Sequence, residues 1–148
     1  MDAYYSMTRP KSCSMGGKES CFMNGFDKET IETVIKMSEN KQDEEIDHDI
    51  YGVIYSLGRD AENSEEFRYA YDKLLKLCKH ANPHVRANSI LSLSMLAGSG
   101  ILEKETVVPI ITEEWKKNRE YRGTIEDAVN DLNDWLKWGI KLEKDSSG

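Results

Sequence analysis

The residues best suited to chemistry are three histidines, and their spacing limits what they can do. His80 and His84 are four residues apart, as two metal ligands on one helix would be, but Pro83 between them predicts a turn. No carboxylate follows them in a metalloprotease arrangement. His48 lies in an acidic segment that lacks the glycine of a calcium loop. We therefore expect solvated or capping histidines and no metal site.

The three cysteines also argue against a reactive centre. Cys13, Cys21 and Cys78 are odd in number, irregularly spaced and without a Cys-x-x-Cys pair, which is typical neither of a disulfide framework nor of a zinc site. We expect reduced thiols in a cytoplasmic protein, with Cys78 on the apolar face of a helix. No glycine-rich loop follows a strand, and no nucleophile is paired with a histidine and an acid. The sequence predicts no catalytic residue, no cofactor and a protein that is not an enzyme.

Two tyrosines indicate binding instead. Tyr51 and Tyr55 lie four residues apart on a predicted helix, away from its apolar residues, and Asp47 extends their stripe by one turn. Exposed tyrosines in such a stripe are typical of the anchors of a protein interface. The alternative, that they pack under the N-terminal residues or against the fourth helix, stays open at this point.

The charge is concentrated in one part of the chain. The 148 residues include 20 Lys and Arg and 27 Asp and Glu, a net charge of −7, and residues 27–66 alone hold 13 acids and 4 bases. This part is either a solvated loop and helix entrance, where acids favour the helix dipole, or a negative patch that attracts a basic partner. The acidity argues against a nucleic-acid partner. No apolar run approaches the ~20 residues of a membrane helix, so we expect no membrane partner.

The apolar residues recur with helical spacing from residue 27 to about 141, and almost nothing alternates with a period of two. The sequence predicts an all-α fold, with residues 1–26 as a flexible leader, 27–141 as a single helical domain and 142–148 as a disordered tail. Asp27 and Asn82 are expected helix caps, Gly58 an expected helix end, and Thr124 with Asp127 a capping box. The helices are expected at about 28–38, 46–57, 64–81, 83 to 98 or 100, 104–118 and from 124 onward. Trp115 and Trp135 are expected in the core.

These helices repeat in pairs. Leu57, Leu93 and Leu132 align with steps of 36 and 39 residues, and a period in this range is typical of a solenoid of helical hairpins. About three hairpins fit the chain, and each buries its apolar face against its neighbour.

The middle pair carries a family resemblance. Leu74 to Cys78, then Asn82-Pro83-His84-Val85-Arg86 and Leu93, resemble a HEAT repeat over residues 64–98. Residues 28–58 lack both the proline and the Val-Arg pair, and residues 103–138 lack the Val-Arg pair. The resemblance implies a short right-handed superhelix whose second, fourth and sixth helices line a concave surface. It also implies that Arg86 is a rung in a hydrogen-bond ladder between repeats.

That surface is the predicted partner-binding site. Its expected residues are Asp47, His48, Tyr51, Tyr55, His84, Asn88, Leu91, Ser92, Asp127, Asn130 and Asp131. It is acidic at both ends and aromatic on one side, which suits a basic protein surface. We hypothesise a non-enzymatic protein-binding module, such as an immunity or inhibitor protein that neutralises a basic protein toxin. An adaptor or assembly factor that holds a subunit is the alternative. HEAT-like DNA glycosylases resemble this fold too, but they need a basic groove.

Overall fold

The computed structural model describes residues 27–39 and 49–143, and the regular structure in these ranges is entirely helical. The all-α prediction is therefore confirmed. The expected leader (1–26) and residues 144–148 of the expected tail lie outside the described residues. The helices are α1 (Lys28–Ser38), α2 (Asp49–Arg59), α3 (Ser64–Leu77), α4 (Pro83–Met95), the short 3-10 helix η4 (Ala97–Ser99), α5 (Lys104–Lys117) and α6 (Arg122–Leu136).

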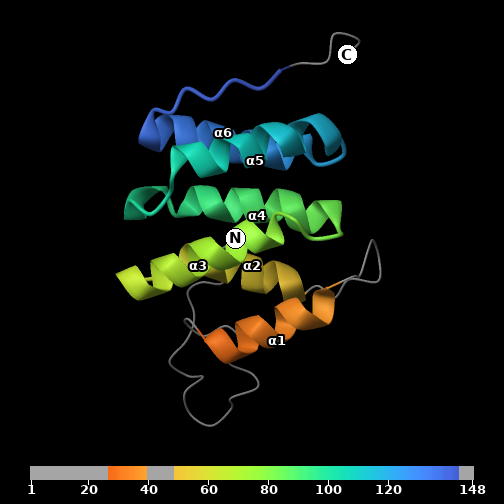
Figure 1. Cartoon of the computed structure of the whole chain (residues 1–148), viewed down its shortest axis with the longest axis vertical. Helices are drawn as coiled ribbons and strands as arrows, with labels where there is room; N and C mark the ends of the chain where they lie inside the picture. Colours follow the sequence, from red (N-terminus) through yellow and green to blue (C-terminus); the bar gives the residue numbers. More distant parts are fainter. Residues whose placement is uncertain (1–26, 40–48, 144–148) are drawn as a thin grey trace.

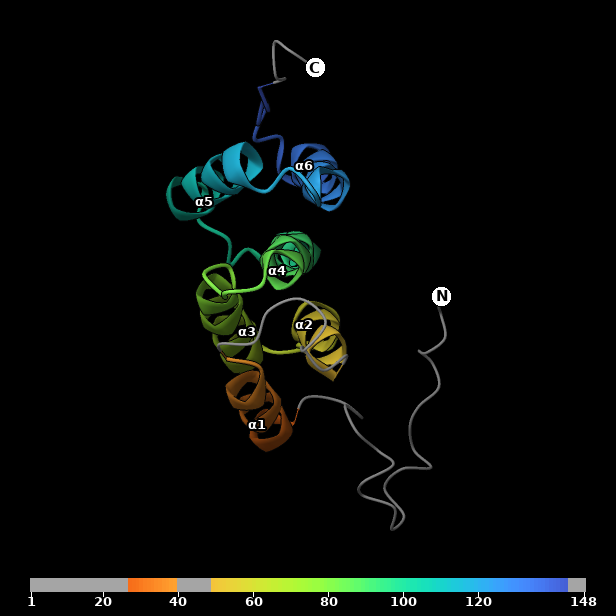
Figure 2. The same cartoon turned by 90° about the vertical axis from the view of Figure 1, so that its right-hand side faces the viewer.

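The six α-helices form two layers, with α1, α3 and α5 in one and α2, α4 and α6 in the other (Figures 1 and 2). α1 packs on α2, α3 on α4 and α5 on α6, so three helix pairs follow one another along the long axis. α4 lies between α2 and α6 and makes its most extensive contacts with them. The second, fourth and sixth α-helices therefore share one side of the molecule.

Local sequence signals fix several helix starts as predicted. The Asp27 side chain accepts hydrogen bonds from the Thr30 amide and hydroxyl at the start of α1. Asn82 caps α4 by accepting from the amides of His84 and Val85, and Pro83 is the first residue of that helix. Each cap satisfies amides that have no partner within their own helix.

Other predicted boundaries are wrong. α6 begins at Arg122 after Tyr121, with no side-chain cap, so Thr124 lies inside the helix and makes no capping box. α4 ends at Met95, earlier than expected, because the chain tightens into η4 before Gly100 adopts a left-handed conformation. Gly58 lies within α2 and does not end it.

The helical structure also ends earlier than the expected residue 141. α6 stops at Leu136, where Lys137 adopts a positive φ of 55°, and residues 137–143 are not helical. Asn133 holds this segment, because its amide nitrogen donates to the Ile140 carbonyl and its oxygen accepts from the Ile140 amide. Trp115 donates from Nε1 to the Glu143 carbonyl. Residues 142 and 143 therefore pack on α5 and do not belong to a disordered tail.

A single hydrophobic core joins the three helix pairs. It runs from Ile31 on α1 through Leu57, Leu93 and Ile125 to Ile140 after α6. Trp115 and Cys78 are buried in it as expected, but Trp135 is 70% exposed, so its predicted burial is wrong. Trp135 lies at the edge of the buried stripe of α6, whose members are Ile125, Ala128, Val129 and Leu132.

None of the helices in residues 27–39 and 49–143 is long and apolar enough to cross a membrane.

Candidate functional site

The predicted binding residues fall on the layer of α2, α4 and α6 where they are described, but they differ in exposure. Asp47 and His48 lie outside the described residues. Tyr55, Asp127, Asn130 and Asp131 are exposed, and Tyr51, His84 and Leu91 are half-buried. Asn88 and Ser92 are buried, so their expected places on an outward surface are wrong.

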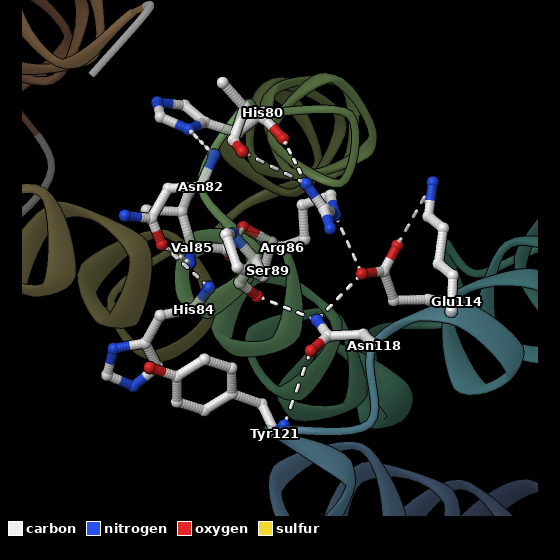
Figure 3. Close-up of polar contacts among 12 residues, drawn as sticks. His80, Asn82, His84, Val85, Arg86, Ser89, Glu114, Asn118 and Tyr121 are labelled. Carbon is white, nitrogen blue, oxygen red and sulfur yellow. Dashed lines mark hydrogen bonds and ion pairs between the residues drawn. The ribbon is translucent and has the colours of Figure 1, made fainter. Parts of the chain in front are cut away.

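Three aromatic rings form a row across this layer. The His84 ring lies 4.8 Å from that of Tyr51 on α2, and it stacks on Tyr121, before α6, with centroids 4.3 Å apart and planes 9° apart. Figure 3 shows His84 and Tyr121 facing each other. The row therefore joins one residue from each helix pair, and the mutual contacts of the three rings hold them in place.

The environment of the row keeps His84 neutral. Burial lowers the pKa of His84, and the nearby carboxylate of Glu120 opposes this only in part. The pKa of Tyr51 is raised, chiefly by burial and then by Tyr121. Both side chains are thus uncharged at neutral pH, which suits stacking between partly desolvated rings.

Asn88 supports the row from behind. Its side-chain nitrogen donates to the His84 carbonyl at 2.9 Å, and its oxygen accepts from the Tyr55 hydroxyl at 3.4 Å. Tyr51 and Tyr55 therefore both contact α4, which is the alternative that the sequence left open. Tyr55 still has 37% of its surface exposed, so packing on α4 and contact with a partner are compatible.

Ser92 has a structural role at a place where α2 and α4 approach each other closely. Its hydroxyl donates to the Ile54 carbonyl at 2.6 Å. A Cβ atom on Gly58 would lie 2.3 Å from Ser92 Oγ and 2.5 Å from Ser92 O. The two helices meet here because both residues are small.

Sequence reasoning missed two apolar residues of this layer. The exposed large apolar side chains of the described residues are Met37, Tyr55, Met95 and Trp135. Three of them lie on α2, α4 and α6, one on each. Met95 continues the spacing of His84, Asn88 and Leu91 along α4, and Trp135 continues that of Asp127 and Asp131 along α6. Helical spacing was therefore a usable signal for both.

We call this surface the α2–α4–α6 face. It is defined by Tyr51, Tyr55, His84, Leu91, Met95, Tyr121, Asp127, Asp131 and Trp135. It combines exposed apolar and aromatic side chains with two exposed carboxylates.

A polar network lies behind the row and links the helix pairs (Figure 3). Arg86 donates from Nε to Glu114 on α5 at 2.7 Å and from one terminal nitrogen to the His80 carbonyl at 2.9 Å. Asn118 donates to Glu114 at 2.8 Å and to the Pro83 carbonyl at 2.9 Å. Arg86 therefore connects the second helix pair to the third, and its role as a rung in a hydrogen-bond ladder between HEAT repeats stays a prediction.

Glu114 and Asn118 were missed, although a signal exists. Both recur with Val107 and Ile111 at helical spacing, so they fall within the apolar stripe of α5 and are buried. Buried polar groups require partners, and the arginine of the preceding pair supplies one.

His80 belongs to the same network and its tautomer follows from its partners. The Asn82 amide donates to Nδ1 at 3.0 Å, so Nε2 carries the proton and donates to the Ser38 carbonyl at 3.0 Å. His80 thus connects the end of α1 to the start of α4.

The described residues do not meet what a reactive thiol or a metal site requires. Burial, followed by the charge of Glu114, raises the pKa of Cys78 to about 12, so its thiol stays protonated at neutral pH. In residues 27–39 and 49–143, no group of three or more His, Cys, Asp and Glu side chains could hold a metal ion.

Comparison with protein-family models, curated proteins and solved structures finds no match to this chain.

Proposed function

We propose that this chain is a protein-binding module that uses the α2–α4–α6 face. The observation that carries the proposal is the placement of Tyr55, Met95 and Trp135, which expose 37%, 42% and 70% of their surface on three neighbouring helices. Apolar side chains gathered on one face typically mark an interaction site. The aromatic row adds rings whose positions are already fixed, which lowers the entropy that binding must remove.

The charge of this face favours a basic partner. Asp127 and Asp131 are exposed on α6, and the chain as a whole carries a net charge of −7. Complementary charge accelerates encounter and excludes wrong partners more than it raises affinity. The more specific form of the proposal is an immunity or inhibitor protein that covers a basic protein toxin.

We further propose that the helix pairs form a short HEAT-like superhelix with this face on its inner side. The support is the repeat of 36 and 39 residues, the side-by-side layers in Figure 2 and the contact of Arg86 with Glu114 of the next pair.

The test compares capture by three forms of the full chain. The parent, the triple variant Tyr55→Ala/Met95→Ala/Trp135→Ala and the control Met37→Ala are used to isolate partners from cells of the source. Met37 is a matched control because it is 62% exposed but lies on α1, in the other layer. A true partner is retained by the parent and the control and lost by the triple variant.

Binding measurements with the purified chain and its purified partner then give the size of the loss in affinity. Loss of an interface hot spot costs ~2 kcal/mol or more, so the triple variant should weaken binding at least about thirtyfold, mainly through faster dissociation. Asp131→Lys should slow association and flatten its dependence on salt. Unchanged affinity of the triple variant, or equal loss in Met37→Ala, contradicts the proposal.

An assay of the partner's activity distinguishes a toxin inhibitor from an adaptor. If the partner is a toxin, one equivalent of this chain should abolish its activity. A partner that is one subunit of a larger assembly, and is not inhibited, supports the adaptor alternative.

A further inference from the structure

The opposite layer contains a pocket that the proposed function does not use. α1, α3 and the turn after α3 enclose an open pocket of about 750 Å³. This volume lies in the range of small-molecule sites, which is ~300–1,000 Å³. Its cationic lining residues are Lys36, Lys73, Lys76 and Lys79.

One of these lysines is neutralised within the pocket wall. Lys73 Nζ lies 2.6 Å from Glu32 Oε2, and the Tyr69 hydroxyl donates to the same oxygen. These two contacts lower the pKa of Glu32, so Glu32 and Lys73 form a closed pair at neutral pH and leave no net charge.

The other three lysines keep their charge available. Among the described residues no carboxylate forms an ion pair with Lys36, Lys76 or Lys79. Among the described lining residues Glu39 is the remaining acid, so this part of the lining carries a positive excess in a chain whose net charge is −7. Lys36 and Lys76 lie in the last turns of their helices, where a cation is favourable without any ligand. Lys79 directly follows the C-cap Cys78 of α3, so all three lysines lie at helix C-termini, and the pocket is positive because two such ends meet in its wall.

The remaining lining residues of the pocket are apolar or are held in place by hydrogen bonds. Ile35 is half-buried and Leu77 is buried, and both face the pocket with Ala81. Both ring nitrogens of His80 are engaged by Ser38 and Asn82, which holds this part of the wall in place. The pocket thus offers three ammonium groups beside a small apolar surface.

We propose that this pocket binds a small organic polyphosphate. Lysine ammonium groups bind phosphate oxygens as point charges, and Lys36, Lys76 and Lys79 reach one pocket from two segments of the chain. The apolar part of the ligand rests against Ile35 and Leu77. The pocket lies in the layer opposite the α2–α4–α6 face, so this proposal does not depend on protein binding there.

The test is calorimetric titration of the full chain with ATP, tripolyphosphate and adenosine at low ionic strength. We expect ATP and tripolyphosphate to bind, ATP more tightly, and adenosine not to bind, because the phosphates supply the charge and the apolar part only adds contact. Lys36→Gln/Lys79→Gln should weaken ATP binding about tenfold or more, since the double variant removes two of the three ammonium groups that the phosphates contact. Glutamine preserves helix propensity, and circular dichroism verifies that the variant is folded.

The control is Lys104→Gln/Lys116→Gln, which removes the same charge from α5, where neither residue lines this pocket. It should change ATP binding less than twofold. The proposal is overturned if neither phosphate compound binds, or if both double variants weaken binding equally, which would indicate general electrostatics. A single-stranded oligonucleotide that binds more tightly than ATP and loses binding in the pocket variant would also overturn it, in favour of a nucleic-acid site.

Discussion

Single residues in this chain connect helix pairs that are distant in sequence. Glu114 has only 4% of its side chain exposed, yet it accepts hydrogen bonds from Arg86 and Asn118. A buried carboxylate that loses its partner destabilises a protein by ~3–5 kcal/mol. The network therefore holds the second pair against the third by making any separation of Arg86 from Glu114 unfavourable.

His80 should make the stability of the protein depend on pH. Burial lowers the pKa of His80 below its ordinary value of about 6.5, and a proton on Nδ1 would also break the hydrogen bond from the Asn82 amide. The unfolded chain then binds more protons than the folded one as the pH falls through this range. The free energy of unfolding should be greatest above about pH 6.5 and decrease below it, by at most ~1.4 kcal/mol per pH unit for each histidine.

The measurement is urea unfolding between pH 7.5 and 5, where the carboxylate of Glu32 stays ionised because its pKa is lowered. His80→Gln should be less stable at pH 7.5 and show a smaller slope. His84→Gln, whose parent histidine also has a lowered pKa, should remove a separate share of the slope. If His80→Gln keeps the full slope of the parent, the assignment to His80 is wrong.

Contacts between residues that are close in the sequence could be predicted, and contacts between residues that are distant in the sequence could not. The cap of Asp27 on Thr30 involves neighbours in the sequence, and it was predicted. The stacking of Tyr121 on His84 joins residues of two helix pairs, and no pattern in the sequence around Tyr121 indicates it. Helical spacing counts Trp135 among the apolar residues of the sixth helix, whereas its position lies at the edge of the stripe that α6 buries.

At the scale of the helices, the junction of α2 and α4 depends on small residues. Gly58 and Ser92 let the two backbones approach, and the Ser92 hydroxyl bonds to the Ile54 carbonyl. The sequence suggested a helix end for Gly58 because glycine is common there. The reason that residue 58 must lack a side chain is the position of α4, which the sequence around Gly58 does not indicate.

Gly58→Ala should therefore destabilise the protein, although alanine favours helix by ~1 kcal/mol. The new Cβ would meet Ser92 Oγ at 2.3 Å and Ser92 O at 2.5 Å, and overpacking of this kind costs ~1–3 kcal/mol. Ser92→Ala in the same chain should rescue only part of the loss, because the backbone oxygen of residue 92 remains. Chemical unfolding of the three chains measures this.

The matched control is Gly123→Ala in the first turn of α6. A Cβ there has no neighbour within 4 Å, so the change should leave stability unchanged or raise it by up to ~1 kcal/mol. A Gly58→Ala variant as stable as the parent would mean that α2 and α4 can separate without loss, against the close packing described above.

Over the whole molecule, the sequence repeat predicted which helices pair, because steps of 36 and 39 residues return each apolar stripe to the same place. It did not predict residues 137–143. Their position depends on Asn133, which binds both backbone groups of Ile140, and on Trp115, which donates to Glu143. These contacts lie after the last helix, so they follow no period of the sequence.

The continuous core predicts that the three helix pairs unfold together. All three tryptophans, Trp115, Trp135 and Trp138, lie in or directly after the third pair, so their fluorescence reports on that pair, while circular dichroism reports on every helix. Leu57 is fully buried in α2, and Leu57→Ala should cost ~2–5 kcal/mol. Because the core is shared, this change should shift the urea midpoint of the tryptophan signal by the same amount as that of the helical signal. Met37→Ala, at an exposed site on α1, should shift neither. Two separate transitions in the Leu57 variant, with the tryptophan midpoint unmoved, would show that the third pair is stable alone and that the stack is a set of independent units.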